Sequence, residues 1–131
     1  MFHISDPRDI KNGRVTDVYF ARTLEVLKAK GIDKRVRAEF FAKTLPGADK
    51  WAVLAGIEEV AHLMEGRNVN IRCFREGEVF CPWEPVMEIE GMYQEFCVFE
   101  TALLGLICEA SGVATKAARI RLAAKDKLVV S

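Results

Sequence analysis

The sequence lacks an excess of charge of either sign. Its 131 residues include 19 basic and 19 acidic side chains, so the formal net charge at pH 7 is zero. A chain that binds nucleic acid or an anionic membrane through its overall field carries a clear basic excess, which is missing here. We therefore expect no nucleic-acid partner, and any charge-based function must be local.

Metal-binding cysteine patterns are missing too. The chain contains four cysteines, and their separations form neither a CxxC pair nor a zinc-finger spacing. Two of the four lie in strongly apolar surroundings, so the sequence predicts reduced thiols in the core and no metal site. The four are Cys73, Cys81, Cys97 and Cys108.

Targeting signals and nucleotide-binding motifs are absent as well. Residues 1–9 contain no apolar h-region, and no run approaches the roughly 20 apolar residues that span a bilayer. We expect a cytoplasmic location and no membrane association. There is no P-loop motif, no GxGxxG motif and no nucleophile elbow, and no residue qualifies as a general acid or base. No catalytic residue is therefore predicted.

What is present is enough apolar material for one folded domain. Half of the residues are hydrophobic, and 131 residues can bury a real core but are few for a two-domain enzyme. No internal repeat, low-complexity tract or linker divides the chain. The sequence therefore predicts a single α+β domain over residues 1–131.

The spacing of apolar residues predicts both helices and strands. Helices are expected at 17–30, 57–64, 96–110 and 114–125. Thr16 is the expected cap of the first helix, Ser111-Gly112 is the expected break between the last two, and the helix at 96–110 is apolar enough to be buried on nearly all sides. Strands are expected at 35–45, 69–74, 78–81 and 85–90. Residues 128–131 look like the start of another, buried strand.

Tyr19 is the first candidate for a binding residue. It lies off the apolar stripe of its helix, at the exposed start, and Asp17 beside it suits the positive end of the helix. An aromatic face in that position can stack on a flat ligand. Spacing alone favours a plainer alternative, in which Tyr19 packs at a domain edge or an oligomer interface.

A basic cluster near the C-terminal end is the second candidate. Lys116 and Arg119 lie in the last predicted helix, and the basic residues of this region face a single acid, Asp126. Such a cluster can hold a carboxylate or a phosphate. Composition alone favours a solvated basic face instead, and no aromatic residues interleave with the charges as they do in nucleic-acid sites.

Glu100 is the acidic residue that differs from the others. Most glutamates of the middle segment fit solvated strand faces, whereas Glu100 lies in a helix with few other polar residues. A buried carboxylate there would need hydrogen bonds or a cation. His62 is isolated on an amphipathic helix and is more typical of a surface histidine than of a ligand.

Several segments together resemble the nicotinate phosphoribosyltransferase family. They run in chain order between about Asp9 and Ser131 and are most similar to the short archaeal-type members. The segments are TDVYF at 16–20, EG at 76–77, PV at 85–86, IEG at 89–91, FETALLGL at 99–106 and SGVATK at 111–116. The last two are the most specific.

The resemblance implies an activity and a fold. The family forms nicotinate mononucleotide and pyrophosphate from nicotinate and phosphoribosyl pyrophosphate in NAD biosynthesis, usually with ATP hydrolysis, and Mg²⁺ is expected on the pyrophosphate. Its N-terminal α/β domain, an antiparallel sheet flanked by helices, precedes an irregular α/β barrel. Its dimers place the N-terminal domain of one subunit over the barrel of the other. The barrel would begin near Leu128, so we expect this chain to lack the barrel and to be inactive alone.

The resemblance also assigns roles to residues. Tyr19 matches the tyrosine that stacks on the pyridine ring across the dimer interface, and Asp17 precedes it in the same motif. Related quinolinate enzymes carry Glu-Arg where this chain has Glu100-Thr101, and the arginine reaches the second carboxylate of quinolinate. Thr101 cannot form that ion pair, which argues for nicotinate, although Lys116 or Arg119 could compensate.

Other interpretations stay open at this stage. The chain could be a non-catalytic binding or regulatory module that retains the fold, with its apolar surface covered by self-association. It could also be a fragment of a quinolinate phosphoribosyltransferase. A biotinyl- or lipoyl-carrier domain is more remote, because no lysine lies at a tight strand turn between Val69 and Gly91.

Overall fold

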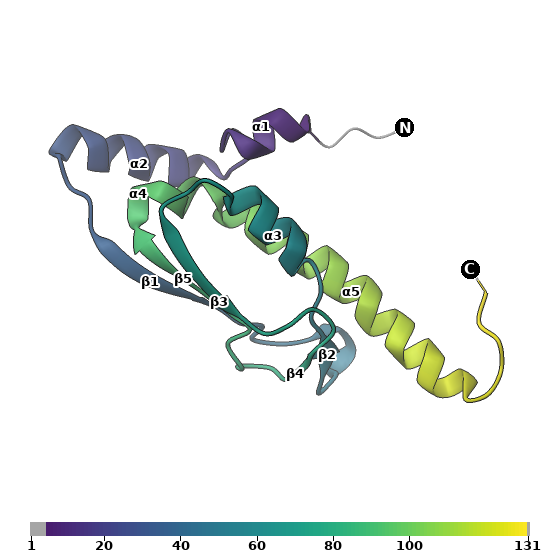
Figure 1. Cartoon of the computed structure of the whole chain (residues 1–131). Helices are drawn as coiled ribbons and strands as arrows, with labels where there is room; N and C mark the ends of the chain where they lie inside the picture. The colour runs from purple at the N-terminus through teal and green to yellow at the C-terminus, as the bar shows by residue number, and fades with distance from the viewer. Residues whose placement is uncertain (1–4, 131) are drawn as a thin grey trace.

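The computed structural model describes residues 5–130 and has the α+β fold expected from the sequence. Figure 1 shows the elements in chain order from purple to yellow. They are α1 (Pro7–Lys11), α2 (Val18–Lys30), β1 (Arg35–Phe40), the 3-10 turn η1 (Pro46–Ala48), β2 (Ala52–Val53), α3 (Ile57–Met64), β3 (Val69–Cys73), β4 (Val79–Phe80), β5 (Met87–Met92), α4 (Tyr93–Phe96), the 3-10 turn η2 (Cys97–Phe99) and α5 (Glu100–Ala124).

The strands form two small antiparallel sheets. One is three-stranded in the order β1-β5-β3, and the other pairs β2 with β4. In the larger sheet, Ile89 of β5 lies opposite Ala38 of β1 and Ile71 of β3. Both sheets are open, and within residues 5–130 no barrel is closed. The fold thus matches the expected antiparallel sheet with helices against it.

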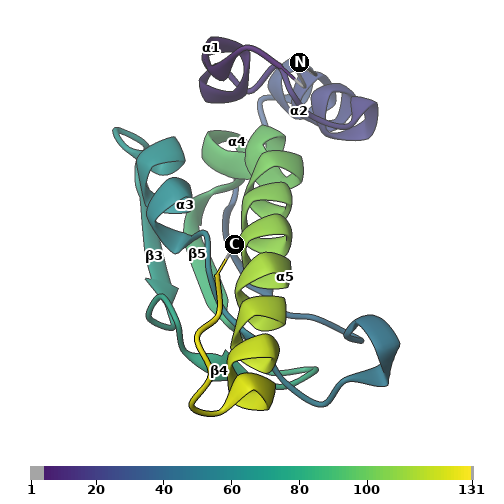
Figure 2. The same ribbon diagram turned by 90° about the vertical axis from the view of Figure 1, so that its right-hand side faces the viewer.

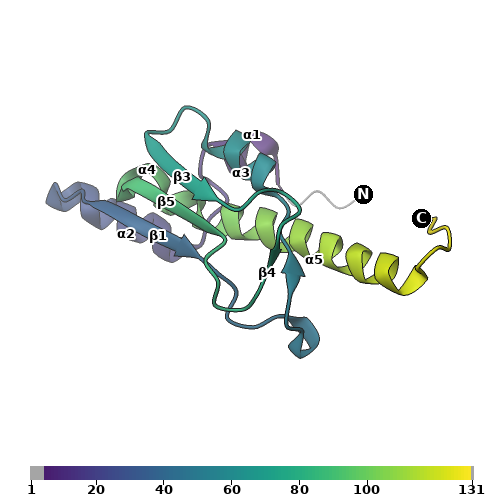
Figure 3. The same ribbon diagram turned by 60° about the horizontal axis from the view of Figure 1, so that its bottom comes forward.

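One face of the larger sheet is apolar and the other is charged. Along β5, Met87 and Ile89 are buried against α3 and α5, because side chains alternate between the two faces of a strand. Glu88 and Glu90 point to the opposite face. There Arg35 binds Glu90 at 2.8 Å and lowers the pKa of its carboxyl by hydrogen bonding and charge. The helices therefore cover one face only, as Figure 3 shows from below.

Helix α5 is the long element on which the domain is assembled. It runs without interruption for 25 residues, so the predicted break at Ser111-Gly112 is wrong. Ser111 forms part of the buried side of the helix, where its hydroxyl donates to the Ala55 carbonyl and accepts from the Ala55 N–H. Thr115, one turn later, accepts from the N–H of Val53. The segment that was predicted to break the helix therefore supplies hydrogen-bond partners for backbone groups of β2 and of the residues just after it.

The burial of α5 is one-sided, which corrects the expectation of a helix buried all round. Leu103, Ile107, Ser111 and Thr115 are its buried residues and recur at i+4, the spacing of a single helix face. Leu104 on the next face is 43% exposed. By length and composition, the stretch Tyr93–Ala124 could also cross a membrane, contrary to the expectation from the sequence. The core helix of a folded domain meets the same criterion, and α5 supplies Leu103 and Ile107 to this core.

Local boundaries differ from the prediction in several places. Asp17 occupies the N-cap position of helix α2 without a side-chain capping hydrogen bond, whereas the predicted cap, Thr16, has a buried hydroxyl oxygen without a hydrogen-bond partner. Strand β1 ends at Phe40, five residues early, because the chain then leaves the sheet to enter η1. Residues 128–130 form no strand and are exposed, and Ser131 lies outside the described residues.

The cysteines are free, but most are not core thiols. Only Cys97 is buried, and burial raises the pKa of its thiol. Cys73, Cys81 and Cys108 are exposed: Cys73 ends the edge strand β3, Cys81 follows β4, and Cys108 lies next to the buried face of α5, beside Ile107. His62 is on the surface, as expected, within 2.8 Å of the Lys11 ammonium.

Candidate functional site

The starts of α2 and α5 meet at one end of the molecule. Figure 2 shows α1 and α2 gathered at that end of α5, with β4 beside its other end. The Asp17 N–H donates to the Thr101 hydroxyl at 3.2 Å, and that hydroxyl lies 3.4 Å from a carboxylate oxygen of Asp17. Three of the predicted site residues, Asp17, Tyr19 and Thr101, are therefore brought together from segments 84 positions apart.

Tyr19 presents an aromatic face at this junction. The residue is 55% exposed, and its ring stacks on Phe20 at a centroid distance of 4.0 Å with an interplanar angle of 37°. Phe20 is only 4% exposed and anchors the first turn of α2 to the rest of the domain. The tyrosine ring thus has one side against protein and substantial surface left for a flat partner.

Carboxylates surround the phenol of Tyr19. Its pKa is raised, first by desolvation, then by the charges of Glu100 and Asp17. The pKa of Glu100 is raised too, by burial and by the nearby charge of Asp17. Within residues 5–130 Glu100 has no ion-pair partner, so the cation that its position would call for is not supplied by this part of the chain.

Lys116 and Arg119 lie elsewhere. Lys116 comes fifteen residues after Thr101 on the same straight helix, which at 1.5 Å per residue separates them by roughly 22 Å. Arg119 forms an ion pair with Asp49, donates to the Trp51 carbonyl at 2.8 Å, and stacks over the Trp51 ring at 4.9 Å. Within one chain, neither cation can reach a ligand stacked on Tyr19.

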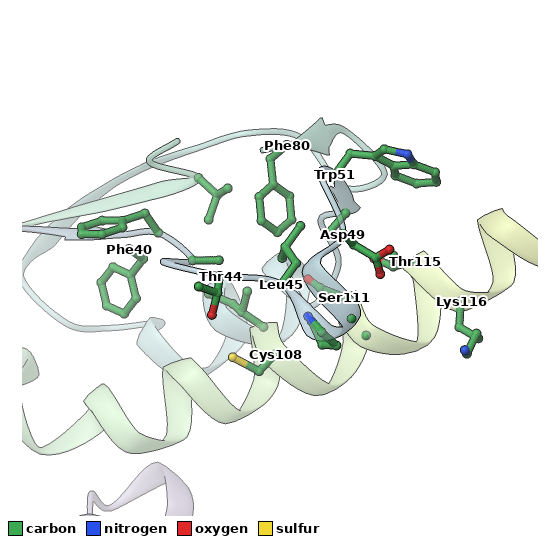
Figure 4. Close-up of a pocket in the computed structure, with 18 of the residues that line it drawn as sticks. Phe40, Thr44, Leu45, Asp49, Trp51, Phe80, Cys108, Ser111, Thr115 and Lys116 are labelled. Carbon is green, nitrogen blue, oxygen red and sulfur yellow. The ribbon is translucent and has the colours of Figure 1, made fainter. Parts of the chain in front are cut away.

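The Arg119–Asp49 contact closes one side of an apolar cavity of about 630 Å³. Figure 4 shows Phe40, Leu45 and Phe80 facing Cys108 and Ser111 of α5 across it, with Lys116 at its edge. This cavity was not predicted from the sequence pattern. The available signal was the spacing of Ile107, Ser111 and Thr115, which places two hydroxyls on the same helix face as a core isoleucine.

Glu76 has a structural role within the segments that carry the family resemblance. Its carboxylate accepts from the N–H groups of Gly56 at 2.7 Å and Ile57 at 3.0 Å. These are free donors at the start of α3, where the N-cap residue is a glycine without a capping side chain. Glu76 therefore serves as the missing cap and is not available for a ligand.

The described residues do not build a site for a divalent cation. No group of three His, Cys, Asp or Glu side chains between residues 5 and 130 is arranged to hold a metal ion. Asp17 and Glu100 are neighbouring carboxylates, and one or two such groups hold Mg²⁺ only together with waters and substrate phosphates. No step of a reaction is assigned to Mg²⁺ or to ATP on these residues.

Comparison with known proteins identifies the family. Residues 17–111 match the family described as quinolinate phosphoribosyl transferase, N-terminal domain. The chain belongs to this family. The matched range begins at Asp17 and ends at Ser111, so it includes the Tyr19 junction and the first half of the cavity wall on α5.

Longer proteins share this phosphoribosyltransferase N-terminal domain. The chain is 26% identical over 145 residues to a nicotinate phosphoribosyltransferase of Bacillus subtilis (strain 168), covering 88% of this chain and 30% of that protein. It is 40% identical over 68 residues to a nicotinate phosphoribosyltransferase of Dictyostelium discoideum, covering 51% and 12%. The chain therefore spans less than a third of the length of these relatives.

Solved structures agree. The crystal structure of nicotinate-nucleotide pyrophosphorylase from Pyrococcus furiosus superposes with a TM-score of 0.92 at 50% identity, covering 96% of this chain and 32% of that one. Human nicotinic acid phosphoribosyltransferase superposes with a TM-score of 0.79 at 23% identity, covering 88% and 30%, and shows the common fold. The domain is thus one part of a larger architecture in each of these proteins.

Proposed function

We propose that this chain is the N-terminal part of a nicotinate phosphoribosyltransferase, which forms nicotinate mononucleotide and pyrophosphate from nicotinate and phosphoribosyl pyrophosphate. The observation that carries the proposal is the exposed Tyr19 ring, held at the junction of α2 and α5 next to Asp17 and Thr101. A flat pyridine ring is a suitable partner for that face.

The contribution of this chain to the reaction is orientation. The pyridine nitrogen displaces pyrophosphate at the anomeric carbon of the ribose, and the rate of such a displacement depends on holding the ring in line with the breaking bond. Tyr19 would stack on the ring and limit its tilt. Mg²⁺, when bound by the complete enzyme, would neutralise the departing pyrophosphate, and ATP hydrolysis is expected to be coupled to turnover.

Nicotinate is favoured over quinolinate by the side chain at position 101. A second substrate carboxylate needs a cation at this junction, and Thr101 offers only a hydroxyl that is already bonded to Asp17. The compensation considered from the sequence is unfavourable within one chain, because Arg119 is paired with Asp49 and Lys116 lies about 22 Å away along α5. Quinolinate remains the alternative substrate.

The remaining machinery is proposed to lie outside these 131 residues. The family's phosphate-binding residues are expected in the barrel, and α5 leaves apolar side chains such as Leu104, Val113 and Leu122 exposed. A barrel domain, or a second copy in a homo-oligomer, would cover such a surface. We propose a cytoplasmic enzyme and expect the isolated chain to be inactive.

Product formation tests the proposal. The purified chain is supplied with nicotinate, phosphoribosyl pyrophosphate, ATP and Mg²⁺, with quinolinate in a parallel reaction. The same assay is run on a chimera in which this chain replaces the matching domain of the Pyrococcus furiosus relative. We expect no product from the chain alone and nicotinate-dependent product from the chimera. Equal use of quinolinate by the chimera would remove the argument from Thr101, and turnover by the chain alone would reveal a phosphate site within it.

A further inference from the structure

Helix α2 is held by unusually little apolar contact. Of its 13 residues only Phe20 is buried, so the hydrophobic core alone does not fix how the helix is oriented. Polar contacts supply the rest. At its C-terminal end, the Gln94 amide donates to the Ile32 carbonyl at 2.8 Å and the Gln94 N–H donates to Asp33 at 3.3 Å. At its N-terminal end, the contact is with Thr101.

The N-terminal contact uses Thr101 in place of a conventional cap. Asp17 has the extended backbone of an N-cap residue, with φ −67° and ψ 142°, yet its side chain makes no capping hydrogen bond within α2. Its carboxylate is directed to the Thr101 hydroxyl instead, and its own N–H donates to the same oxygen. The hydroxyl of Thr16, the residue before it, is buried and bonded to nothing within the described chain.

We propose that Thr101 is a positioning residue for Tyr19: its hydroxyl holds Asp17 at the start of α2 and so fixes the direction in which the Tyr19 ring is presented. Tyr19 comes two residues after Asp17, in the first turn of the helix, so rotation or fraying of that turn moves the ring directly. The proposal rests on the proposed function only in taking Tyr19 as the face that meets the substrate ring.

This role explains why a residue with a hydroxyl, such as threonine, suits position 101. A hydroxyl at this position can donate to a carboxylate and accept from an N–H at the same time, which an arginine cannot do because it carries no acceptor. An arginine would leave the Asp17 N–H without this partner and bring a charge beside the carboxylates of Asp17 and Glu100. Thr101 then couples substrate choice to the orientation of α2.

Three substitutions in this chain separate the hydroxyl from the shape of the side chain. Thr101→Val keeps the shape and removes the hydroxyl, Thr101→Ala removes both, and Thr101→Ser keeps the hydroxyl. Amide hydrogen exchange at Asp17 and the NMR signals of the Tyr19 ring are measured in each, with the amide of Ile89 in the central strand as the internal control. No substrate is present, so the outcome does not depend on the assay of the proposed function.

The expected result is local and depends on the hydroxyl. Thr101→Val and Thr101→Ala should speed exchange at the Asp17 amide roughly fivefold and shift the Tyr19 ring signals towards their random-coil positions, because a net hydrogen bond of about 1 kcal/mol is lost. Thr101→Ser should behave as wild type, and exchange at Ile89 should be unchanged in every variant. Wild-type exchange at Asp17 and an unchanged Tyr19 ring in Thr101→Ala would overturn the proposal, whether or not Thr101→Val folds.

Discussion

Gly56 lies directly against the backbone carbonyl of Leu106, and a Cβ at position 56 would be 2.6 Å from the Leu106 oxygen. The residue also has φ +94°, a conformation that side chains other than glycine rarely adopt. Strand β2 leads into helix α3 at this point, and α3 packs on α5 there. The close approach of the two backbones depends on the missing side chain.

Gly56→Ala should therefore be strongly destabilising. We expect a loss of about 3 kcal/mol in the free energy of unfolding, since backbone strain and a steric overlap add. Urea denaturation measures it. Gly66→Ala is the matched control, because Gly66 also has positive φ, +77°, but no atom lies within 4 Å of its would-be Cβ. The control should lose only about 1 kcal/mol, and equal losses would show that the contact with Leu106 is unimportant.

Ser111→Ala should destabilise the domain by about 1–2 kcal/mol in the same measurement. The substitution leaves both the N–H and the carbonyl of Ala55 without their partner in a part-buried place. Lys116→Ala, on the exposed side of the same helix, changes no such contact and should be nearly neutral. A neutral Ser111→Ala would mean that water replaces the hydroxyl at no cost.

Glu100→Gln should change how stability depends on pH. The folded-state pKa of Glu100 is raised above its ordinary value of 4.5 by burial and by Asp17. A raised carboxyl pKa means that the folded state binds the proton more tightly, so stability is highest when the group is protonated and falls as pH rises through the raised pKa. The variant should thus be more stable than wild type near pH 7, and the difference should vanish at pH below the ordinary value.

Urea unfolding at a series of pH values measures this difference. The charged and titratable groups beside Glu100 are Asp17, Tyr19 and Tyr93. Glu109→Gln, on the exposed side of α5, is the control and should keep the wild-type profile. A gain for Glu100→Gln that persists undiminished at acid pH would contradict the assignment.

Tyr19→Ala should weaken nicotinate use in the chimera described above. Loss of the stacking face should raise the KM for nicotinate about tenfold, while the exposed position of the side chain leaves the fold intact. Tyr19→Phe keeps the ring and should retain most of the affinity. Ordinary nicotinate kinetics in Tyr19→Ala would return this residue to a packing role.

Much of the fold could be predicted from local pattern. The helix Ile57–Met64 and the left-handed Gly31 that ends α2 were read from apolar spacing and from a glycine at the helix end. The break at Ser111-Gly112 was wrong because a serine-glycine pair is usually a helix stop, whereas here Ser111 is bonded to Ala55, a residue 56 positions away. Such a partner is invisible to a local pattern.

In the candidate site too, some features could be predicted from local pattern and others depend on contacts between distant segments. Tyr19 was a candidate because its place at a helix start is a local property, whereas its position beside Thr101 depends on the Asp17–Thr101 contact between residues 84 positions apart. Lys116 and Arg119 lie apart from Tyr19 and Thr101 within this chain, because α5 continues unbroken for 15 and 18 residues beyond Thr101, which the sequence pattern did not show. The partner of Arg119, Asp49, lies in a turn whose position depends on tertiary packing.

Because α5 is continuous, a tilt at one of its ends displaces the other end. Its 25 residues span roughly 37 Å, with Thr101 near one end and residues beyond the cavity-lining Arg119 at the other. For a rigid rod of that length, a tilt of about 5° at the Thr101 end displaces Ala124 by roughly 3 Å. A tilt of α5 at the Asp17–Thr101 contact would therefore move the far end of the helix by about 3 Å.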